Sequence, residues 1–153
     1  MRGASEPTAA AKLRPANAAD LVSVEQLLEE NGLPRDGVRE ALDDFIVAEL
    51  GGQVVGAIGL EVYGNCALLR SAVVKDTERG TGLGARLVDG ILERAGGHSV
   101  QSVYLLTTTA EDYFPRFGFA PTARDEVPSQ LNQSVEFRGA CPDTAVVMVR
   151  AIV

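Results

Sequence analysis

The most informative stretch of the chain is "LLRSAVVKDTERGTGLGARLVDGILERA", residues 68–95. An apolar run typical of a strand is followed by charged residues, then by Gly80, Gly82 and Gly84, and then by the pattern of a helix. Glycine costs about 1 kcal/mol relative to alanine inside a helix. Three glycines where a helix begins therefore indicate that something comes very close to the backbone there.

Two phosphate-binding motifs fit this stretch poorly. A P-loop needs a lysine and a hydroxyl residue after its last glycine, and neither follows here. The dinucleotide pattern Gly-x-Gly-x-x-Ala is formally present from Gly80 to Ala85, but "KDTER" separates it from its strand. The next strand also lacks the acidic residue expected about 20 positions further on. Two interpretations then remain: a third phosphate-binding motif, or a glycine-rich turn that binds no ligand.

Length and charge limit the class of protein. The 153 residues fit one domain, with residues 1–11 expected as a flexible tail and 12–153 as the folded part. A net charge of −7 argues against a nucleic-acid partner. There is no apolar run long enough to span a bilayer and no secretory signal pattern, so we expect a cytoplasmic protein without a membrane partner. Cys66 and Cys141 are expected to be small buried residues.

The pattern along the chain predicts a mixed α/β fold. Asn17 is placed as the cap of a first helix that ends at Gly32, and a long helix follows the three glycines. Shorter helices are expected within 39–44 and 110–119. The predicted strands are 12–16, 45–50, 53–63, 66–74, 100–109 and 144–153.

The run Arg79-Gly80-Thr81-Gly82-Leu83-Gly84 resembles the pyrophosphate loop of the GNAT acetyltransferases, whose pattern is Gln/Arg-x-x-Gly-x-Gly/Ala. The segments "RSAVVKDTERGTGLGARLV" and "AEDYFPRFGF" resemble further motifs of that family, and the likeness extends over nearly the whole chain from Lys12. It implies a mixed, mostly antiparallel, splayed sheet of six to seven strands with about four helices. Free amides at the helix start would bind the pyrophosphate of coenzyme A.

The resemblance implies acetyl-CoA as the cosubstrate and no metal. Its pantetheine arm would lie between the strands "LLRSAVV" and "VYLLTTT", and the amide of Val74 would polarise the thioester carbonyl. The residues expected to bind acetyl-CoA are Ala72, Val73, Val74, Arg79, Gly80, Thr81, Gly82, Leu83, Gly84, Ala85, Thr107 and Phe114.

The resemblance also implies direct transfer to an amine in a ternary complex. The position of the family's tyrosine acid holds Phe114, so its neighbour Tyr113 is the candidate acid, with core packing as an equal alternative and only a modest catalytic effect expected. The family's base position matches Leu68, which cannot accept a proton. Glu61 is the nearest candidate base, although a solvated strand end or proton transfer to water remains open.

Arg70 stands in the middle of an apolar strand, on the expected face of Leu68 and Ala72. A buried guanidinium needs an anion, which is either a partner such as Glu61 or the carboxylate of the acceptor, and the acceptor is slightly favoured.

A closer resemblance lies in the second half of the chain. The matching segments are 106–110, Val127-Pro128, Glu136-Phe137 and Cys141-Pro142. They resemble the acetyltransferase domain of N-acetylglutamate synthase and N-acetyltransferases associated with arsenic resistance. This implies a small acceptor with an amine and a carboxylate, bound by Arg70 and Glu136 and covered by residues 129–138.

Two other functions stay open at this point. The chain could hold acetyl-CoA as a regulatory module without turnover, or bind arsenic through Cys66 and Cys141. A homodimer is common in the family that the chain resembles, and sheet edges are available for one.

Overall fold

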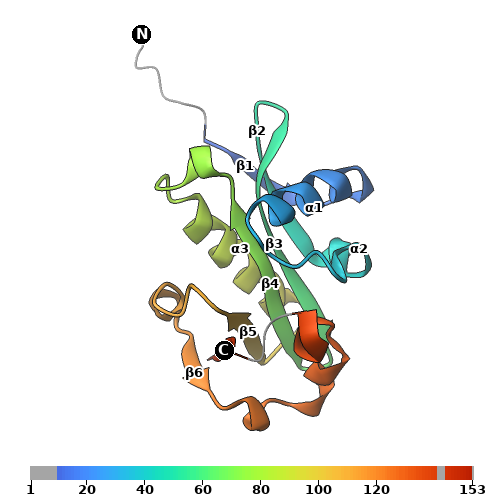
Figure 1. The fold of residues 1–153 in the computed structure, drawn as a ribbon, viewed down its shortest axis with the longest axis vertical. Helices are drawn as coiled ribbons and strands as arrows, with labels where there is room; N and C mark the ends of the chain where they lie inside the picture. The colour runs from blue at the N-terminus through green and yellow to red at the C-terminus, as the bar shows by residue number, and fades with distance from the viewer. Residues whose placement is uncertain (1–9, 141–143, 153) are drawn as a thin grey trace.

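The computed structural model describes residues 10–140 and 144–152, and seven strands in these ranges form one sheet in the order β1-β2-β3-β4-β5-β7-β6 (Figure 1). Neighbouring strands are antiparallel, except that β4 and β5 are parallel. The strands are β1 Lys12–Pro15, β2 Phe45–Leu50, β3 Gln53–Tyr63, β4 Cys66–Val74, β5 Ser102–Thr107, β6 Ala120–Thr122 and β7 Val146–Ala151. The mixed, mostly antiparallel sheet is as predicted, and β6 is an addition to it.

In the same residue ranges, three α-helices accompany the sheet: α1 Leu21–Glu30, α2 Val38–Ala41 and α3 Leu83–Gly97. The predicted cap is confirmed, because the Asn17 side chain accepts from the Ala19 amide at 2.9 Å and the Asp20 carboxylate accepts from the Asn17 amide at 2.8 Å. The helix expected within 110–119 is a single 3-10 turn, Phe114–Phe117. Other 3-10 turns are Ala18–Asp20, Leu42–Asp44, Asp76–Glu78, Arg124–Glu126 and Ser129–Gln133, and a π-helical turn spans Glu136–Ala140.

The helices cover both faces of the sheet. Helix α3 lies on one side and α1 with α2 on the other (Figure 1). The buried side of α3 packs with Ile58 and Leu60 of β3, and α1 packs with Phe45 and Val47 of β2. A third apolar cluster joins Leu68 of β4 to Leu131 of the C-terminal segment, residues 129–140. This segment therefore packs against the same sheet as the helices and continues the cover on the α1 side.

A β-bulge interrupts β4. Arg70 pairs with Gly59 and Val73 with Ala57, so Ser71 and Ala72 together oppose one residue of β3. Ser71 adopts a φ of 60°, which is uncommon outside glycine. The extra residue inverts the alternation of side chains and puts Val73 on the face of Arg70. The prediction that Ala72 shares this face is therefore wrong.

Strands β4 and β5 separate after a short contact. Their pairing in the described chain is limited to Cys66–Ser102, Ala67–Val103 and Leu68–Tyr104. Beyond these pairs, residues 69–74 of β4 and residues 105–107 of β5 diverge. The bulge adds local twist to β4, which favours this divergence. The splayed sheet is confirmed.

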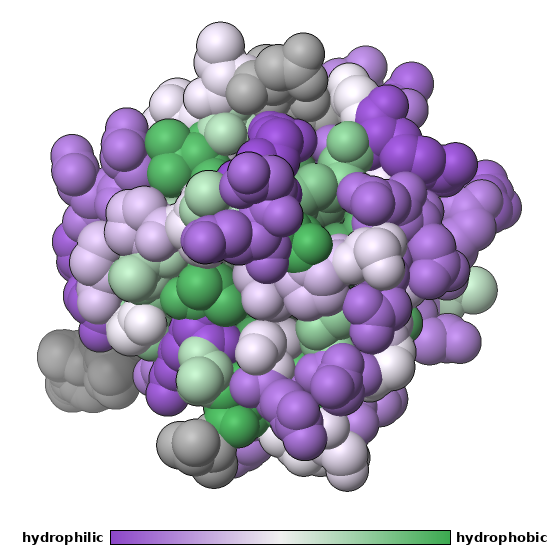
Figure 2. All heavy atoms as spheres, turned by 90° about the horizontal axis from the view of Figure 1, so that it is seen from below, coloured by the Kyte–Doolittle hydropathy of each residue, from purple (hydrophilic) through white to green (hydrophobic). Residues whose placement is uncertain are grey.

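The described surface is largely polar. Figure 2 shows small apolar areas between hydrophilic side chains on the face seen from below. Only Val22 and Leu33 are exposed large hydrophobic side chains among the described residues. In the same part of the chain, no helix combines the length and the hydropathy needed to cross a bilayer. Most of the predicted N-terminal tail, residues 1–9, lies outside the described residues.

Candidate active site

A cavity of about 360 Å³ occupies the gap between β4 and β5. Residues 69–74 of β4 and 105–107 of β5 form two of its walls, and the first turn of α3 closes a third. Asn31, Leu33 and Pro34, which follow α1, line it from the opposite face of the sheet. The splay thus creates a cavity that the N-terminus of α3 borders directly. Of the residues predicted to bind acetyl-CoA, those that line it are Ala72, Val73, Val74, Arg79, Gly84, Thr107 and Phe114.

The first turn of α3 is open to a ligand. Gly80 and Gly82 have φ values of 80° and 85°, a conformation that glycine adopts without strain. A Cβ at either position would meet no atom within 4 Å, so the space in front of the backbone is clear. The first amides of a helix have no intrahelical acceptor, and they carry the positive end of the helix dipole. This arrangement suits a phosphate group.

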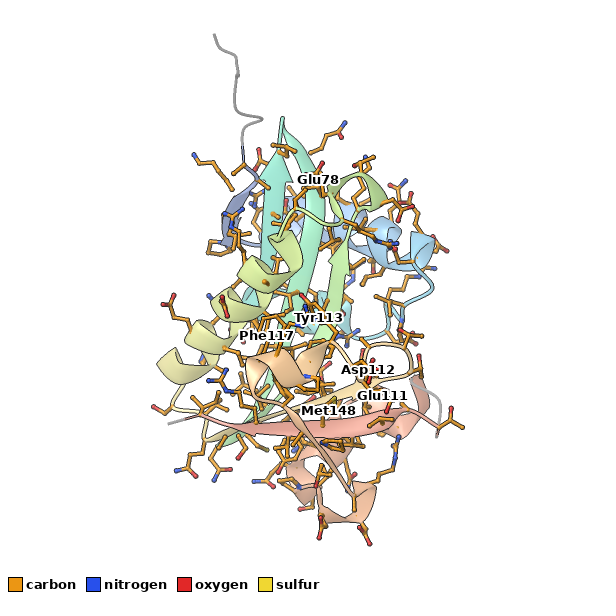
Figure 3. The ribbon with its side chains drawn as sticks, turned by 90° about the vertical axis from the view of Figure 1, so that its left-hand side faces the viewer. Glu78, Glu111, Asp112, Tyr113, Phe117 and Met148 are labelled. Atoms are coloured by element: carbon orange, nitrogen blue, oxygen red, sulfur yellow. The ribbon has the colours of Figure 1, made fainter. Side chains whose placement is uncertain are left out.

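The loop before α3 is tied to its surroundings. The Thr81 hydroxyl donates to the Glu78 carbonyl at 2.6 Å, and Figure 3 shows Glu78 in this loop. Arg79 reaches the Asn31 side-chain oxygen at 2.5 Å and the Asp76 carboxylate at 3.0 Å. Because the Arg79 side chain is 60% exposed, its guanidinium also remains accessible to an anion.

Tyr113 brings a hydroxyl to the start of α3. Its hydroxyl oxygen lies 3.0 Å from the position that a Cβ of Gly84 would take, and Tyr113 lines the cavity. Figure 3 places Tyr113 and Phe117 beside α3, with Glu111 and Asp112 on the side of the turn away from it. Phe114 packs into the main core instead. The ring of Tyr113 contacts that of Phe114, so core packing and a hydroxyl in the cavity coexist.

Arg70 has two protein carboxylates as partners. It is 2% exposed, and its Nη1 donates to Glu61 Oε2 at 2.6 Å. Its Nη2 lies 3.4 Å from Glu136 Oε2, and its Nε donates to the Ser71 hydroxyl at 2.9 Å. The pairing with Glu61 that the sequence left open is therefore present. Binding of an acceptor carboxylate by Arg70 stays a prediction.

Glu61 faces away from the cavity between β4 and β5. It lines a second cavity of about 640 Å³ beside α2. Its Oε1 accepts from the Tyr63 hydroxyl at 2.6 Å. Burial, followed by the bond to Glu61, raises the pKa of Tyr63, so that this hydroxyl stays protonated and donates. Gly37 lies against the pair, because a Cβ there would be 3.0 Å from Arg70 Nη1. The Arg70–Glu61 pair thus lies between the two cavities.

Sequence reasoning missed some features of the site and placed others. Asn31 and Pro34 flank the predicted helix end at Gly32, but no motif placed them at the cavity, and the bulge at Ser71 has no glycine to mark it. Glu136, expected to bind the acceptor, does line the cavity. Cys66 is buried, with its Sγ 3.4 Å from the Tyr63 carbonyl, and Cys141 lies outside the described residues.

Comparisons with known proteins agree with this geometry. The family described as "Acetyltransferase (GNAT) domain" matches residues 41–121. An amino-acid acetyltransferase of Mycobacterium tuberculosis is 32% identical over 129 residues, covering 78% of this chain and 74% of the relative. An amino-acid acetyltransferase of Neisseria meningitidis is 25% identical over 136 residues, covering 83% of this chain but only 31% of the relative. The chain thus spans about a third of the Neisseria protein.

A solved structure shows the same fold. N-acetylglutamate synthase from Neisseria gonorrhoeae, complexed with coenzyme A and N-acetyl-glutamate, superposes with a TM-score of 0.80. The match covers 98% of this chain and 37% of that one, at 22% sequence identity. The family match and the relative from Mycobacterium tuberculosis settle the classification: the chain is a member of the GNAT acetyltransferase family.

Proposed function

We propose that the chain uses acetyl-CoA to acetylate the amine of a small molecule, an amino acid or an amino-acid-like compound. The observation that carries this proposal is the cavity between β4 and β5, which the open first turn of α3 borders. The names of the relatives support an amino acid as the acceptor. Because the chain spans only part of the Neisseria relatives, we propose this activity for the acetyltransferase unit itself.

The residues present fit coenzyme A. The clear space before Gly80 and Gly82 admits a pyrophosphate, and Arg79 adds a charged donor. Residues 69–74 of β4 are not paired with β5, so their backbone groups are available for hydrogen bonds with the amides of a pantetheine arm. Bound in this way, acetyl-CoA would supply the acetyl group as a thioester in the gap between the strands.

The chain's own groups would then orient and assist the transfer. The amide of Val74 polarises the thioester carbonyl. The Tyr113 hydroxyl, which lines the same cavity, donates a proton to the leaving sulfur. Arg70, which lines the cavity, orients an acceptor carboxylate. Holding both reactants in one cavity supplies a large share of the rate by proximity.

Release of free coenzyme A tests the proposal. The protein should release the thiol from acetyl-CoA when one member of a panel of amino acids, simple amines and an amine-bearing arsenical is added, and acetyl-CoA should raise its melting temperature. A thermal shift without turnover on any amine would favour a regulatory module. No shift at all would contradict the proposed cosubstrate.

A further inference from the structure

We propose that Glu136 accepts the proton that the acceptor's ammonium group must lose before it attacks. This inference rests on the proposed function and adds a catalytic role to a residue expected only to bind the acceptor. It also replaces Glu61 as the candidate base.

The first observation is the position of the two carboxylates. Among the described residues that line the cavity between β4 and β5, Glu136 carries the only carboxylate. Glu61 lines the second cavity, and its two oxygens accept short bonds of 2.6 Å from Arg70 and from Tyr63. Both oxygens of Glu61 thus accept from protein donors outside the cavity between β4 and β5. Glu136 is the carboxylate that shares a cavity with the proposed thioester site.

The second observation is how Glu136 is held. Its Oε2 lies 3.4 Å from Arg70 Nη2, whereas Glu61 lies 2.6 Å from Nη1. The shortest charge-assisted bond of Arg70 therefore goes to Glu61, and Arg70 positions Glu136 through a longer contact. The Glu136 amide donates to the Ser134 hydroxyl at 3.2 Å, which fixes the start of the π-helical turn. Figure 1 shows this C-terminal segment beside the lower end of β3 and β4.

The third observation is the charge of the cluster. Two carboxylates, Glu61 and Glu136, share one guanidinium, and all three side chains are at most 8% exposed. Among these three side chains the carboxylates outnumber the guanidinium, and the group lies beside the cavity. Such a group of side chains attracts an ammonium group. A protonated amine is therefore drawn to the carboxylate that can deprotonate it.

The proton balance is simple. Glu136 takes one proton from the ammonium and leaves a neutral amine with a free lone pair. The nitrogen then bonds to the acetyl carbon as the carbon–sulfur bond breaks. Tyr113 or water gives a proton to the departing sulfur, and the nitrogen then loses its second proton, which restores that donor. Glu136 finally returns its proton to solvent.

The pH dependence of the rate follows from the role of proton acceptor. Arg70 of β4 contacts both Glu136 and Glu61 of β3, and the Tyr63 hydroxyl donates to Glu61. Arg79 and Tyr113 line other walls of the same cavity. The maximal rate should rise with pH, because a general base acts in its deprotonated form.

The test compares Glu136→Gln with Glu126→Gln, which removes the same charge from an exposed side chain outside the cavity. E136Q preserves shape and an oxygen for Arg70. Its kcat should fall about 100-fold or more, and the rise of kcat with pH should disappear. E126Q should behave as the wild type. The melting-temperature shift with acetyl-CoA should be unchanged in both variants, which shows that E136Q is folded.

Three outcomes would overturn the inference. E136Q could keep kcat within about threefold of the wild type, or could raise only the acceptor's KM while its pH profile stays unchanged. Glu136→Asp, which retains a carboxylate one methylene further back, could lose as much kcat as E136Q. Failure of the proposed function would look different, because the wild type itself would then release no coenzyme A.

Discussion

The hydroxyl oxygen of Tyr113 lies 3.0 Å from the point where a Cβ of Gly84 would stand. The phenol therefore rests against the first turn of α3, at the wall of the cavity between β4 and β5. A Cβ at residue 84 would press against this hydroxyl, so the Tyr113 side chain would have to shift by a few tenths of an ångström. The third glycine of the loop thus leaves room for Tyr113 as well as for a ligand.

This contact changes the expected effect of Tyr113→Phe. The motif alone, with Phe114 at the family's acid position, predicts a loss of at most about tenfold. Since Phe114 lies in the core and Tyr113 carries the hydroxyl into the cavity, we now expect kcat to fall about 100-fold, with acetyl-CoA binding unchanged. Tyr104→Phe, outside this cavity, is the matched control. A loss within tenfold in steady-state assays would mean that Tyr113 only packs.

Gly82→Val should abolish the stabilisation by acetyl-CoA. A branched side chain at the start of α3 would occupy the open space that a pyrophosphate needs. Gly52→Val is a matched control, because Gly52 also has a positive φ of 79° and open space around it but lies in the β2–β3 turn. Both variants place a branched side chain at a positive φ, so the backbone strain is the same in both. In a thermal-shift titration, only G82V should lose its response, and a normal response would remove the loop from the binding site.

The ion pair between Arg14 and Asp20 should make the free energy of unfolding depend on pH. Two bonds of 2.8 and 2.9 Å join the guanidinium to the carboxylate, and Arg14 holds the pKa of Asp20 below its ordinary value of 3.8. A carboxyl group whose pKa is lowered on folding stabilises the fold at pH values above its ordinary pKa. This stabilisation is lost as the pH falls below the ordinary pKa and the carboxyl group becomes protonated. Asp20→Asn should lower Tm at pH 7 by roughly 3 °C, or about 1 kcal/mol, given that Arg14 is one-third exposed.

The difference between wild type and D20N should shrink toward pH 3. Asp89→Asn, on an exposed side chain of α3, should leave Tm unchanged at both values. A D20N deficit that stays constant from pH 7 to pH 3 would show that the capping geometry, and not the ion pair, is what the substitution disturbs.

Local sequence patterns predicted the parts of the site that depend on local structure. The glycines at 80–84 mark the start of α3 because a positive φ and an open helix terminus are properties of the segment itself. The capping box of Asn17 and Asp20 is also a local feature, and the sequence predicted one half of it, the cap at Asn17. Strands β2 to β4 followed from their apolar, β-branched runs and short turns.

Other parts depend on contacts between distant segments. The bulge at Ser71 is set by the register of β4 against β3, and serine gives no local signal for a positive φ. Its effect on side-chain alternation could not be read from the sequence. Glu136 meets Arg70 only because the C-terminal segment folds back onto β4 through Leu131. The resemblance to a family suggested this proximity, whereas periodicity could not.

The preference for an acceptor carboxylate is best tested with Arg70→Lys. Removing the charge, as in Arg70→Met, would leave Glu61 and Glu136 buried without a cation and cost about 3–5 kcal/mol of stability, which would mask any effect on binding. Lysine keeps the charge but loses the planar fork that binds a carboxylate through two bonds. We expect R70K to raise the KM of an amino acid about 10- to 100-fold, the loss of roughly 1.5–3 kcal/mol, and to spare the KM of acetyl-CoA.

The comparison needs two acceptors, an amino acid and the amine that remains when its carboxylate is removed. The wild type should prefer the amino acid because only this acceptor carries a carboxylate that can bind Arg70, alongside Glu136 at 3.4 Å from Nη2. R70K should lose that preference and keep its activity on the amine. If R70K instead raises the KM of both acceptors equally, then Arg70 acts only as the ion-pair partner of Glu61 and Glu136. The acceptor is then bound through its ammonium group alone.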